Sequence, residues 1–247
     1  MHQIKNKIIL DPDGPLMKGK INPEEGSVDV SNYSDIYMLN CGKALSSLDY
    51  AIESARLSLS LLNTSALDSI ASNNNGDKAE LIQLWVENSI IRVQSIYDRA
   101  LILVSRVFDL GLANESMSHN TIVCNEHIKR FGVDNLMKAV NKKCNEYRFV
   151  RNSVIHHDRY SEETLDNVTL FLQASHLSVE NGGKPILEQR ILNRIVEEYL
   201  NTKKGELTTY LDDIEVKLNA LYDALIPVYE LKKIHLGTIE IKQTDKE

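Results

Sequence analysis

Hydrophobic residues recur at steps of three and four through the middle of the chain, which is the spacing of amphipathic helices. Within residues 42–67 one such stripe consists of Leu45, Leu48, Ala51, Ile52, Ala55, Leu59 and Leu62. Residues 78–110 repeat the pattern and precede Gly111, a residue type that commonly follows a helix. These two runs predict long helices, and Trp85 and Tyr97 are expected to pack in their core.

Further helical runs follow, separated by breaks at Gly132 and at the segment NGGKP. The predicted helices cover residues 120–131, 134–158, 161–177 and 187–226. The last run has apolar residues in alternating steps of four and three, namely Leu207, Leu211, Ile214, Leu218, Leu221 and Leu225. Such spacing also suits a coiled coil between chains, but packing within one bundle is preferred because other amphipathic helices are available. Gly205 is expected to kink or interrupt this helix and Pro227 to end it.

The two ends of the chain have a different pattern. Residues 1–42 are rich in turn residues and predict an extension with short strands and no long helix. Residues 234–242 alternate apolar and polar side chains, which predicts a strand that pairs with residues 4–10. The expected fold is therefore all-α: a bundle of long antiparallel helices over residues 43–226, with a small β appendage formed by the two termini and a C-terminal strand and tail over residues 227–247.

Composition narrows the choice of partners. The net charge of −7 argues against broad binding to duplex nucleic acid, although a small, locally basic site is compatible with it. Cys41, Cys124 and Cys144 have no CxxC spacing, so neither a disulfide framework nor a zinc site is predicted. No run approaches the roughly 18 apolar residues of a membrane span, and Asp11 interrupts the N-terminus before a signal-peptide core forms. A cytoplasmic protein with no membrane partner is expected.

The segment CNEYRFVRNSVIHHDRY, residues 144–160, contains the residues best suited to chemistry. On one continuous helix, at about 100° per residue, its polar side chains share a face. They are Arg148, Arg151, Asn152, His156 and Arg159. His157 falls on the opposite side, beside the apolar residues Tyr147, Val150 and Val154.

Arginine, asparagine and histidine on one face can cleave RNA without a metal. The attacking 2′-hydroxyl belongs to the substrate, so the protein needs to move a proton and stabilise charge on the phosphate oxygens. Histidine titrates near neutral pH, arginine offers forked donors to phosphate, and asparagine can donate to phosphate or orient the imidazole. The same pattern also suits a solvated polar face, and the residues alone leave both interpretations open.

No other cluster predicts a metal or cofactor site. The remaining histidines are far apart and lack a nearby carboxylate pattern. They include His119, His127, His176 and His235. The carboxylate pairs at residues 197–198 and 212–213 are interpreted as the solvated face of the last helix. We therefore expect no cofactor and no bound metal.

At residues 151–156 the sequence RNSVIH resembles the signature of the HEPN (higher eukaryote and prokaryote nucleotide-binding) family. The signature is an Arg followed by a polar residue, often Asn, with four to six residues between the Arg and a His. The resemblance implies a helical bundle and a metal-independent endoribonuclease, frequently a toxin or phage-defence effector, whose active site forms where two motif helices meet in a homodimer. Arg151, Asn152 and His156 take the catalytic positions, and the products are a 2′,3′-cyclic phosphate and a 5′-hydroxyl.

Residues beside the signature extend this hypothesis. Arg148 and Arg159 are expected to bind RNA phosphate because helical geometry puts them on the same face, and His157 is the alternative to His156 if the helix is distorted. An antitoxin or regulatory partner is a further expectation. However, some related toxins carry Tyr two residues after the His as a site of nucleotidyl modification, whereas Asp158 stands there and Tyr160 lies two residues further on. Some family members are catalytically inactive modules that bind RNA, nucleotide or a protein partner or that dimerise, and this remains the alternative.

Overall fold

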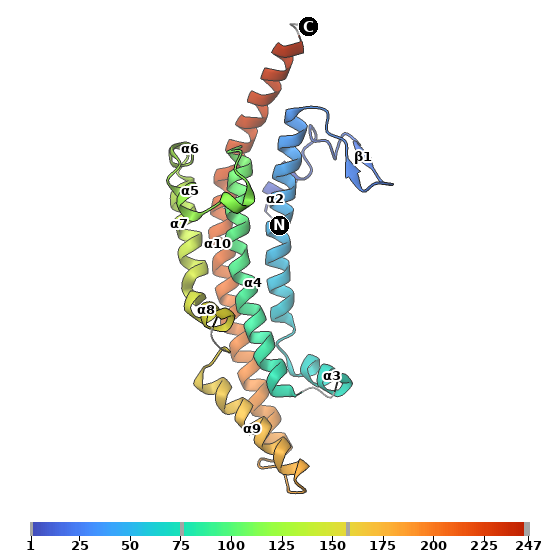
Figure 1. Ribbon diagram of the computed structural model, residues 1–247, viewed down its shortest axis with the longest axis vertical. Coiled ribbons are helices and arrows are strands. Elements are labelled where there is room, and N and C mark those ends of the chain that lie inside the picture. Colours follow the sequence, from blue (N-terminus) through green and yellow to red (C-terminus); the bar gives the residue numbers. More distant parts are fainter. Residues whose placement is uncertain (1, 75–76, 157–158, 245–247) are drawn as a thin grey trace. The chain divides into compact units, whose positions relative to one another are not determined.

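The computed structural model describes residues 2–74, 77–156 and 159–244, and nearly all regular structure in them is helical (Figure 1). This confirms the all-α, HEPN-like helical bundle. In chain order the helices are α1 (Ile4–Ile8), α2 (Tyr33–Ser60), α3 (Thr64–Asn74), α4 (Lys78–Val107), α5 (His119–Val123), α6 (Glu126–Arg130), α7 (Val133–Cys144), α8 (Arg148–His156), α9 (Glu163–Glu180) and α10 (Gln189–Thr244). The short 3-10 turns η1 (Asn114–Ser116) and η2 (Asn145–Tyr147) lie between them. None of the described helices is long and apolar enough to cross a membrane.

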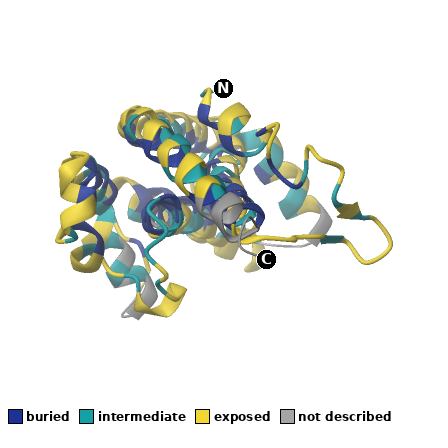
Figure 2. Cartoon of the chain, turned by 90° about the horizontal axis from the view of Figure 1, so that it is seen from above, coloured by how far each residue is buried: buried dark blue, intermediate teal, exposed yellow. Residues whose placement is uncertain are grey.

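The chain divides into two compact units to which α2, α4 and α10 each contribute. The first unit consists of residues 1–51, 95–143 and 214–247, and the second of residues 52–94 and 144–213. Within each unit α2 runs antiparallel to α4 and α10 (Figure 1). The helices have one strip of buried residues and one strip of exposed residues, as the hydrophobic spacing predicts (Figure 2).

In the first unit, aromatic side chains join three helices. The Tyr37 hydroxyl on α2 donates a hydrogen bond to the Val107 carbonyl at the end of α4, at 2.9 Å. The Tyr37 ring stacks on that of Tyr229 on α10, with 5.7 Å between ring centroids. Asp11, only 2% exposed, accepts hydrogen bonds from Tyr229 at 2.8 Å and from Lys233 at 2.9 Å. The N-terminal segment is thereby fixed to α10.

In the second unit, polar pairs join the same helices. The buried hydroxyls of Ser58 on α2 and Ser89 on α4 are 3.0 Å apart and hydrogen-bonded. Arg56 on α2 forms an ion pair with Asp212 on α10, at 2.9 Å. Trp85, 7% exposed, packs in the core as expected, and Tyr97 of the first unit is buried to a similar degree.

The prediction of a sheet between the two termini was wrong. Ile4 and Ile8 lie four residues apart and are both buried, which is the spacing of one turn of helix α1. The segment 234–242, expected to be a strand, is part of α10. The described residues contain a small antiparallel sheet inside the N-terminal extension instead, formed by β1 (Ile21–Asn22) and β2 (Ser27–Val28). The expectation of no long helix before residue 42 was also wrong, because α2 begins at Tyr33.

Gly205 and Pro227 do not interrupt α10, contrary to the prediction. A proline inside a helix removes one hydrogen bond and costs about 3 kcal/mol. Here the apolar stripe continues past it through Val228 and Tyr229, which are at most 5% exposed, and the helix stays packed on both sides of the proline. The six apolar residues between 207 and 225 are at most 1% exposed within the single chain, as expected for packing inside a bundle.

Two predicted helices are divided by asparagine caps. Asn63 separates α2 from α3, and its side chain accepts a hydrogen bond from the Ala66 N–H at 2.9 Å. Asn125 separates α5 from α6 and accepts from the His127 N–H at 2.9 Å. Gly132 ends α6 with φ of +69°, in the left-handed region that favours glycine, as the sequence predicts.

Candidate active site

The motif residues lie on α8, a short helix that was expected to be part of a longer one. The continuous helix predicted over residues 134–158 is wrong at residues 145–147, where the 3-10 turn η2 separates α7 from α8. One reason is visible in the structure: the carbonyl of Cys144 accepts a hydrogen bond from the Tyr210 hydroxyl on α10, at 2.8 Å. The Tyr210 ring also contacts that of Tyr147, with centroids 4.8 Å apart. Side chains of α10 thus hold the point where α8 begins.

The backbone of α8 brings the three signature residues onto one short helix. Arg151, Asn152 and His156 are all inside its bounds, and helical register places them within about 140° of one another. Asn152 is half-buried, whereas Arg148, one turn before it, is exposed. The side chains of Arg151 and His156 lie outside the described residues. The described part of the site is therefore a helix face with Arg148 and Asn152 on it.

Phe149 was overlooked in the sequence and belongs to the same face. Its side chain is 87% exposed, which is unusual for a large apolar residue. At about 100° per residue, position 149 lies about 20° from position 156 and about 60° from position 152 around the helix axis. The register that placed His156 beside Asn152 could have identified Phe149 as well. The face thus combines a cation, an amide and an exposed aromatic ring.

Of the residues proposed beside the signature, Arg148 lies on α8 and Arg159 does not. Arg159 lies beyond the end of α8, so the argument from helical register does not apply to it. Its guanidinium is exposed and 3.4 Å from the carboxylate of Asp166 on α9. His157, the alternative to His156, lies outside the described residues. Arg148 is exposed, and it has no ion-pair partner among the described residues.

The chain that follows the motif is fixed to α4. The backbone N–H of Tyr160 donates to the Glu87 carboxylate at 2.8 Å, and the Tyr160 carbonyl accepts from the Gln83 amide at 2.6 Å. Both backbone polar groups of Tyr160 are therefore held by side chains of α4. These two hydrogen bonds fix the backbone at Tyr160, directly after the motif, because buried backbone groups need hydrogen-bond partners.

A buried lysine on α10 connects the two ends of the motif segment. The ammonium of Lys203 donates to Glu162 at 2.7 Å, to Glu206 at 2.8 Å and to the Tyr160 hydroxyl at 3.2 Å, and its side chain is 6% exposed. Glu206 also accepts a hydrogen bond from the hydroxyl of Tyr147, directly before α8. We name these five residues the Lys203 cluster. It joins the residue that precedes α8 to the residues that follow the motif.

The charges of the Lys203 cluster are complementary. Burial opposes the charge on Lys203, but the hydrogen bonds to Glu162 and Glu206 outweigh it and hold the pKa of the lysine above its ordinary value. Burial likewise raises the pKa of Glu206, yet hydrogen bonds from Lys203 and Tyr147 bring it below its ordinary value. The lysine stays cationic and Glu206 anionic across the neutral range.

Tyr160 is enclosed by this cluster. Its side chain is 6% exposed, and its hydroxyl donates to Glu162 at 2.5 Å. Burial and this hydrogen bond raise its pKa to about 12, so the phenol is neutral at physiological pH. A buried hydroxyl with two partners is poorly placed to receive a modifying group, which agrees with the doubt raised by its position in the sequence.

Among the other histidines, His119 is held by a neighbouring tyrosine. His119 packs against Tyr97 and is hydrogen-bonded to its hydroxyl. Burial, and then the charge of Lys138, lower the pKa of His119. Within the described ranges no group of three or more His, Cys, Asp or Glu side chains is arranged to hold a metal ion.

An all-helical bundle with the residues RNSVIH on a short late helix agrees with the HEPN-type protein expected from the sequence. The sequence also matches the family described as HEPN_Cthe2314-like HEPN, over residues 37–225. The match covers most of the chain, and the protein belongs to this HEPN family. Neither the curated proteins nor the solved structures gave a match.

Proposed function

We propose that the protein is a metal-independent endoribonuclease of the HEPN type. One observation carries the proposal: in a chain that belongs to a HEPN family, Arg151, Asn152 and His156 all lie on the short helix α8. HEPN domains are often ribonucleases, and these three residue types suit cleavage by the 2′-hydroxyl of the substrate.

In this reaction the 2′-oxygen attacks the adjacent phosphorus and the bond from phosphorus to the 5′-oxygen breaks. His156 takes the proton of the 2′-hydroxyl or gives one to the leaving 5′-oxygen. Arg151 binds the scissile phosphate and stabilises the charge that develops on its oxygens, while Asn152 orients phosphate or imidazole. The products are a 2′,3′-cyclic phosphate and a 5′-hydroxyl, and no metal or cofactor takes part.

The exposed face of α8 is proposed to meet a second copy of itself in a homodimer, so that two motif helices form one composite active site. Arg148 adds a contact to a neighbouring phosphate, and Arg159 adds another where it is released from Asp166. Phe149 stacks on an unpaired base beside the scissile phosphate, because an exposed aromatic ring next to a cation is the usual platform for single-stranded RNA. The substrate is then single-stranded at the cut.

The biological role proposed with this activity is that of a toxin or phage-defence effector in the cytoplasm. An antitoxin or another regulatory partner would hold the enzyme inactive, since an unrestrained ribonuclease would damage cellular RNA. The support for this role is the resemblance at residues 151–156 and the family match.

The test is cleavage of labelled single-stranded RNA by the purified protein in EDTA. Arg151→Ala, Asn152→Ala and His156→Ala are compared with Lys129→Met, a control that removes an exposed lysine outside the site. We expect cleavage by the wild type and the control, loss of cleavage in the three variants, and a dimer mass by light scattering for all five proteins. Cleavage that needed a divalent metal, or that survived His156→Ala, would contradict the mechanism.

The second candidate function is a catalytically silent module that binds a partner through α8. The 87% exposure of Phe149 favours it, because buried aromatic residues anchor many protein interfaces. Under this hypothesis no protein in the series cleaves RNA, and Phe149→Asp converts the dimer to monomer. The stripe between residues 207 and 225 is less suitable for this role, because its side chains are already buried within the chain.

A further inference from the structure

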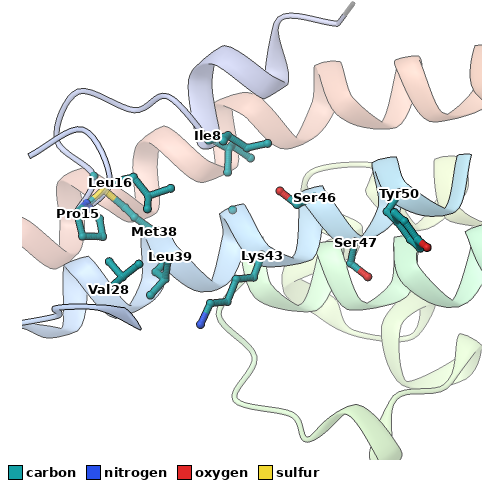
Figure 3. A pocket seen from close by; sticks show the side chains of 13 residues that line it. Ile8, Pro15, Leu16, Val28, Met38, Leu39, Lys43, Ser46, Ser47 and Tyr50 are labelled. Atoms are coloured by element: carbon teal, nitrogen blue, oxygen red, sulfur yellow. The ribbon is translucent and has the colours of Figure 1, made fainter. Parts of the chain in front are cut away.

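A cavity lies in the first unit, between the N-terminal segment and α2, and none of the proposed catalytic residues lines it (Figure 3). Its volume is about 640 Å³, within the range of small-molecule sites in proteins. Apolar side chains from α1, the following loop, β2 and α2 line most of it. They include Ile8, Leu16, Val28, Met38 and Leu39. Such a lining suits the hydrocarbon part of a ligand.

A glycine exposes the backbone of α2 to this space. Gly42 is buried in the middle of the helix, yet a Cβ added there would meet no atom within 4 Å. A buried position with free space beside it faces a void rather than packed side chains. Glycine inside a helix costs roughly 1 kcal/mol relative to alanine, so this position leaves the cavity open at some expense in stability.

The lining of the cavity includes the cation of Lys43. Lys43 follows Gly42 in the lining, and Figure 3 shows its side chain extending outward from α2. Within the described ranges no carboxylate pairs with it. The nearby lysines differ: Lys5 lies 2.8 Å from Asp49, and Lys20 lies 2.6 Å from Asp35. Among the described residues, Lys43 thus has no carboxylate partner, and it lies in the lining of a mostly apolar space.

The other polar side chains in the lining are neutral. Ser46, Ser47 and Tyr50 line the cavity on the next turns of α2 (Figure 3). Their hydroxyls can donate hydrogen bonds to an oxygen of a ligand. One ammonium with neutral donors matches a group of single negative charge, whereas a phosphate dianion would need more cations.

We propose that this cavity binds a small amphiphilic monoanion, namely a single-chain apolar carboxylate. Its hydrocarbon chain lies among Ile8, Leu16 and Met38, and its carboxylate pairs with Lys43. A bound ligand contacts both α1 and α2, and therefore stabilises the packing of the N-terminal segment against α2. The proposal does not depend on ribonuclease activity.

The experiment uses the full chain and three ligands of equal length: decanoate, decanol and decylamine, each below its aggregation concentration. Isothermal titration calorimetry gives the affinities, and thermal unfolding gives an independent measure of stabilisation. We expect decanoate to bind best and decylamine worst. Lys43→Gln should weaken decanoate about threefold to fivefold, the range of a partly exposed ion pair, and leave decanol unchanged.

A second variant fills the cavity. Gly42→Leu should weaken decanoate and decanol by at least about tenfold, since its side chain displaces two or more methylenes of the ligand. Gly205→Leu is the matched control, because Gly205 is also a helical glycine with free space around its Cβ but belongs to the second unit. Absence of binding by all three ligands would overturn the proposal. Equal binding of decanoate and decanol, or decanoate binding that survives Gly42→Leu, would do the same.

Discussion

Replacement of Lys203 by methionine is the most direct test of the contacts that hold the motif segment. Methionine has a similar length but no charge, so Lys203→Met keeps the packing and leaves Glu162, Glu206 and the Tyr160 hydroxyl without their shared donor. We expect the protein to remain folded but to lose stability. We also expect slower RNA cleavage with little change in KM, because the backbone on either side of α8 is less firmly held.

The expected loss of stability depends on how far the side chains of Glu162 and Glu206 are exposed to water. Removing one partner of a fully buried ion pair costs about 3 to 5 kcal/mol. The carboxylates of Glu162 and Glu206 are 28% and 44% exposed, so water solvates them in part when the lysine is gone. We therefore expect a loss of about 2 kcal/mol, equivalent to a fall in Tm of roughly 4 to 8 °C for a chain of this size.

Urea denaturation at pH 7, followed by circular dichroism, measures this loss. Lys129→Met is the matched control, because Lys129 also pairs with a glutamate three residues away but on the surface; it should change stability by less than about 0.5 kcal/mol. The double variant Lys203→Met/Glu206→Gln should lose less than the sum of the single changes. A loss below about 0.5 kcal/mol for Lys203→Met, or additive single changes, would refute the argument that this lysine holds the segment together.

Three further predictions concern other parts of the molecule. Phe149→Ala should lower cleavage of single-stranded RNA about tenfold or more and leave Tm within about 2 °C, whereas Phe149→Trp should retain activity, as gel assays and thermal unfolding can show. Pro227→Ala should raise the free energy of unfolding by about 1 kcal/mol or more, because it restores a helical N–H at an exposed position; urea titration checks this. Asp11→Asn should destabilise at pH 7 by about 1 to 3 kcal/mol. Burial raises the pKa of Asp11, but hydrogen bonds, first that of Lys233, bring it below its ordinary value. The contribution of Asp11 to the free energy of unfolding is therefore present above about pH 4. The difference in stability between wild type and Asp11→Asn should shrink as pH falls through the lowered pKa.

The periodic part of the fold could be predicted from the sequence because it depends on local spacing. The stripe between residues 207 and 225 is buried almost completely, and Gly132 ends a helix as expected. The errors occurred where a local signal competes with distant packing. Pro227 was expected to end α10, but Tyr229 and Lys233 beyond it are held by Asp11, more than 200 residues earlier in the chain.

The six consecutive residues RNSVIH are sufficient to predict a motif, but the surroundings of these residues could not be predicted from the sequence. Helical register was sufficient to place Asn152 beside His156, and the same register could have indicated Phe149. The contacts of Lys203 could not be derived from the sequence. Its spacing of three after Leu200 and four before Leu207 places it beside the apolar stripe, but the spacing does not identify the partners of a buried cation. Its burial depends on Tyr147, Tyr160 and Glu162, which are about 40 to 60 residues away and meet it only in the folded unit.

The division between α7 and α8 gives these contacts their importance. A helix of nine residues is too short to be stable by itself, since isolated helices of fewer than about 12 residues are marginal in water. Its position therefore depends on what holds its two ends: Tyr210 and Glu206 before it, and Glu87, Gln83 and Lys203 after it. A continuous helix over residues 134–158 would have held the motif through its own backbone. With the break, the geometry of the motif depends on α4 and α10, so substitutions in those two helices should alter activity without contacting RNA.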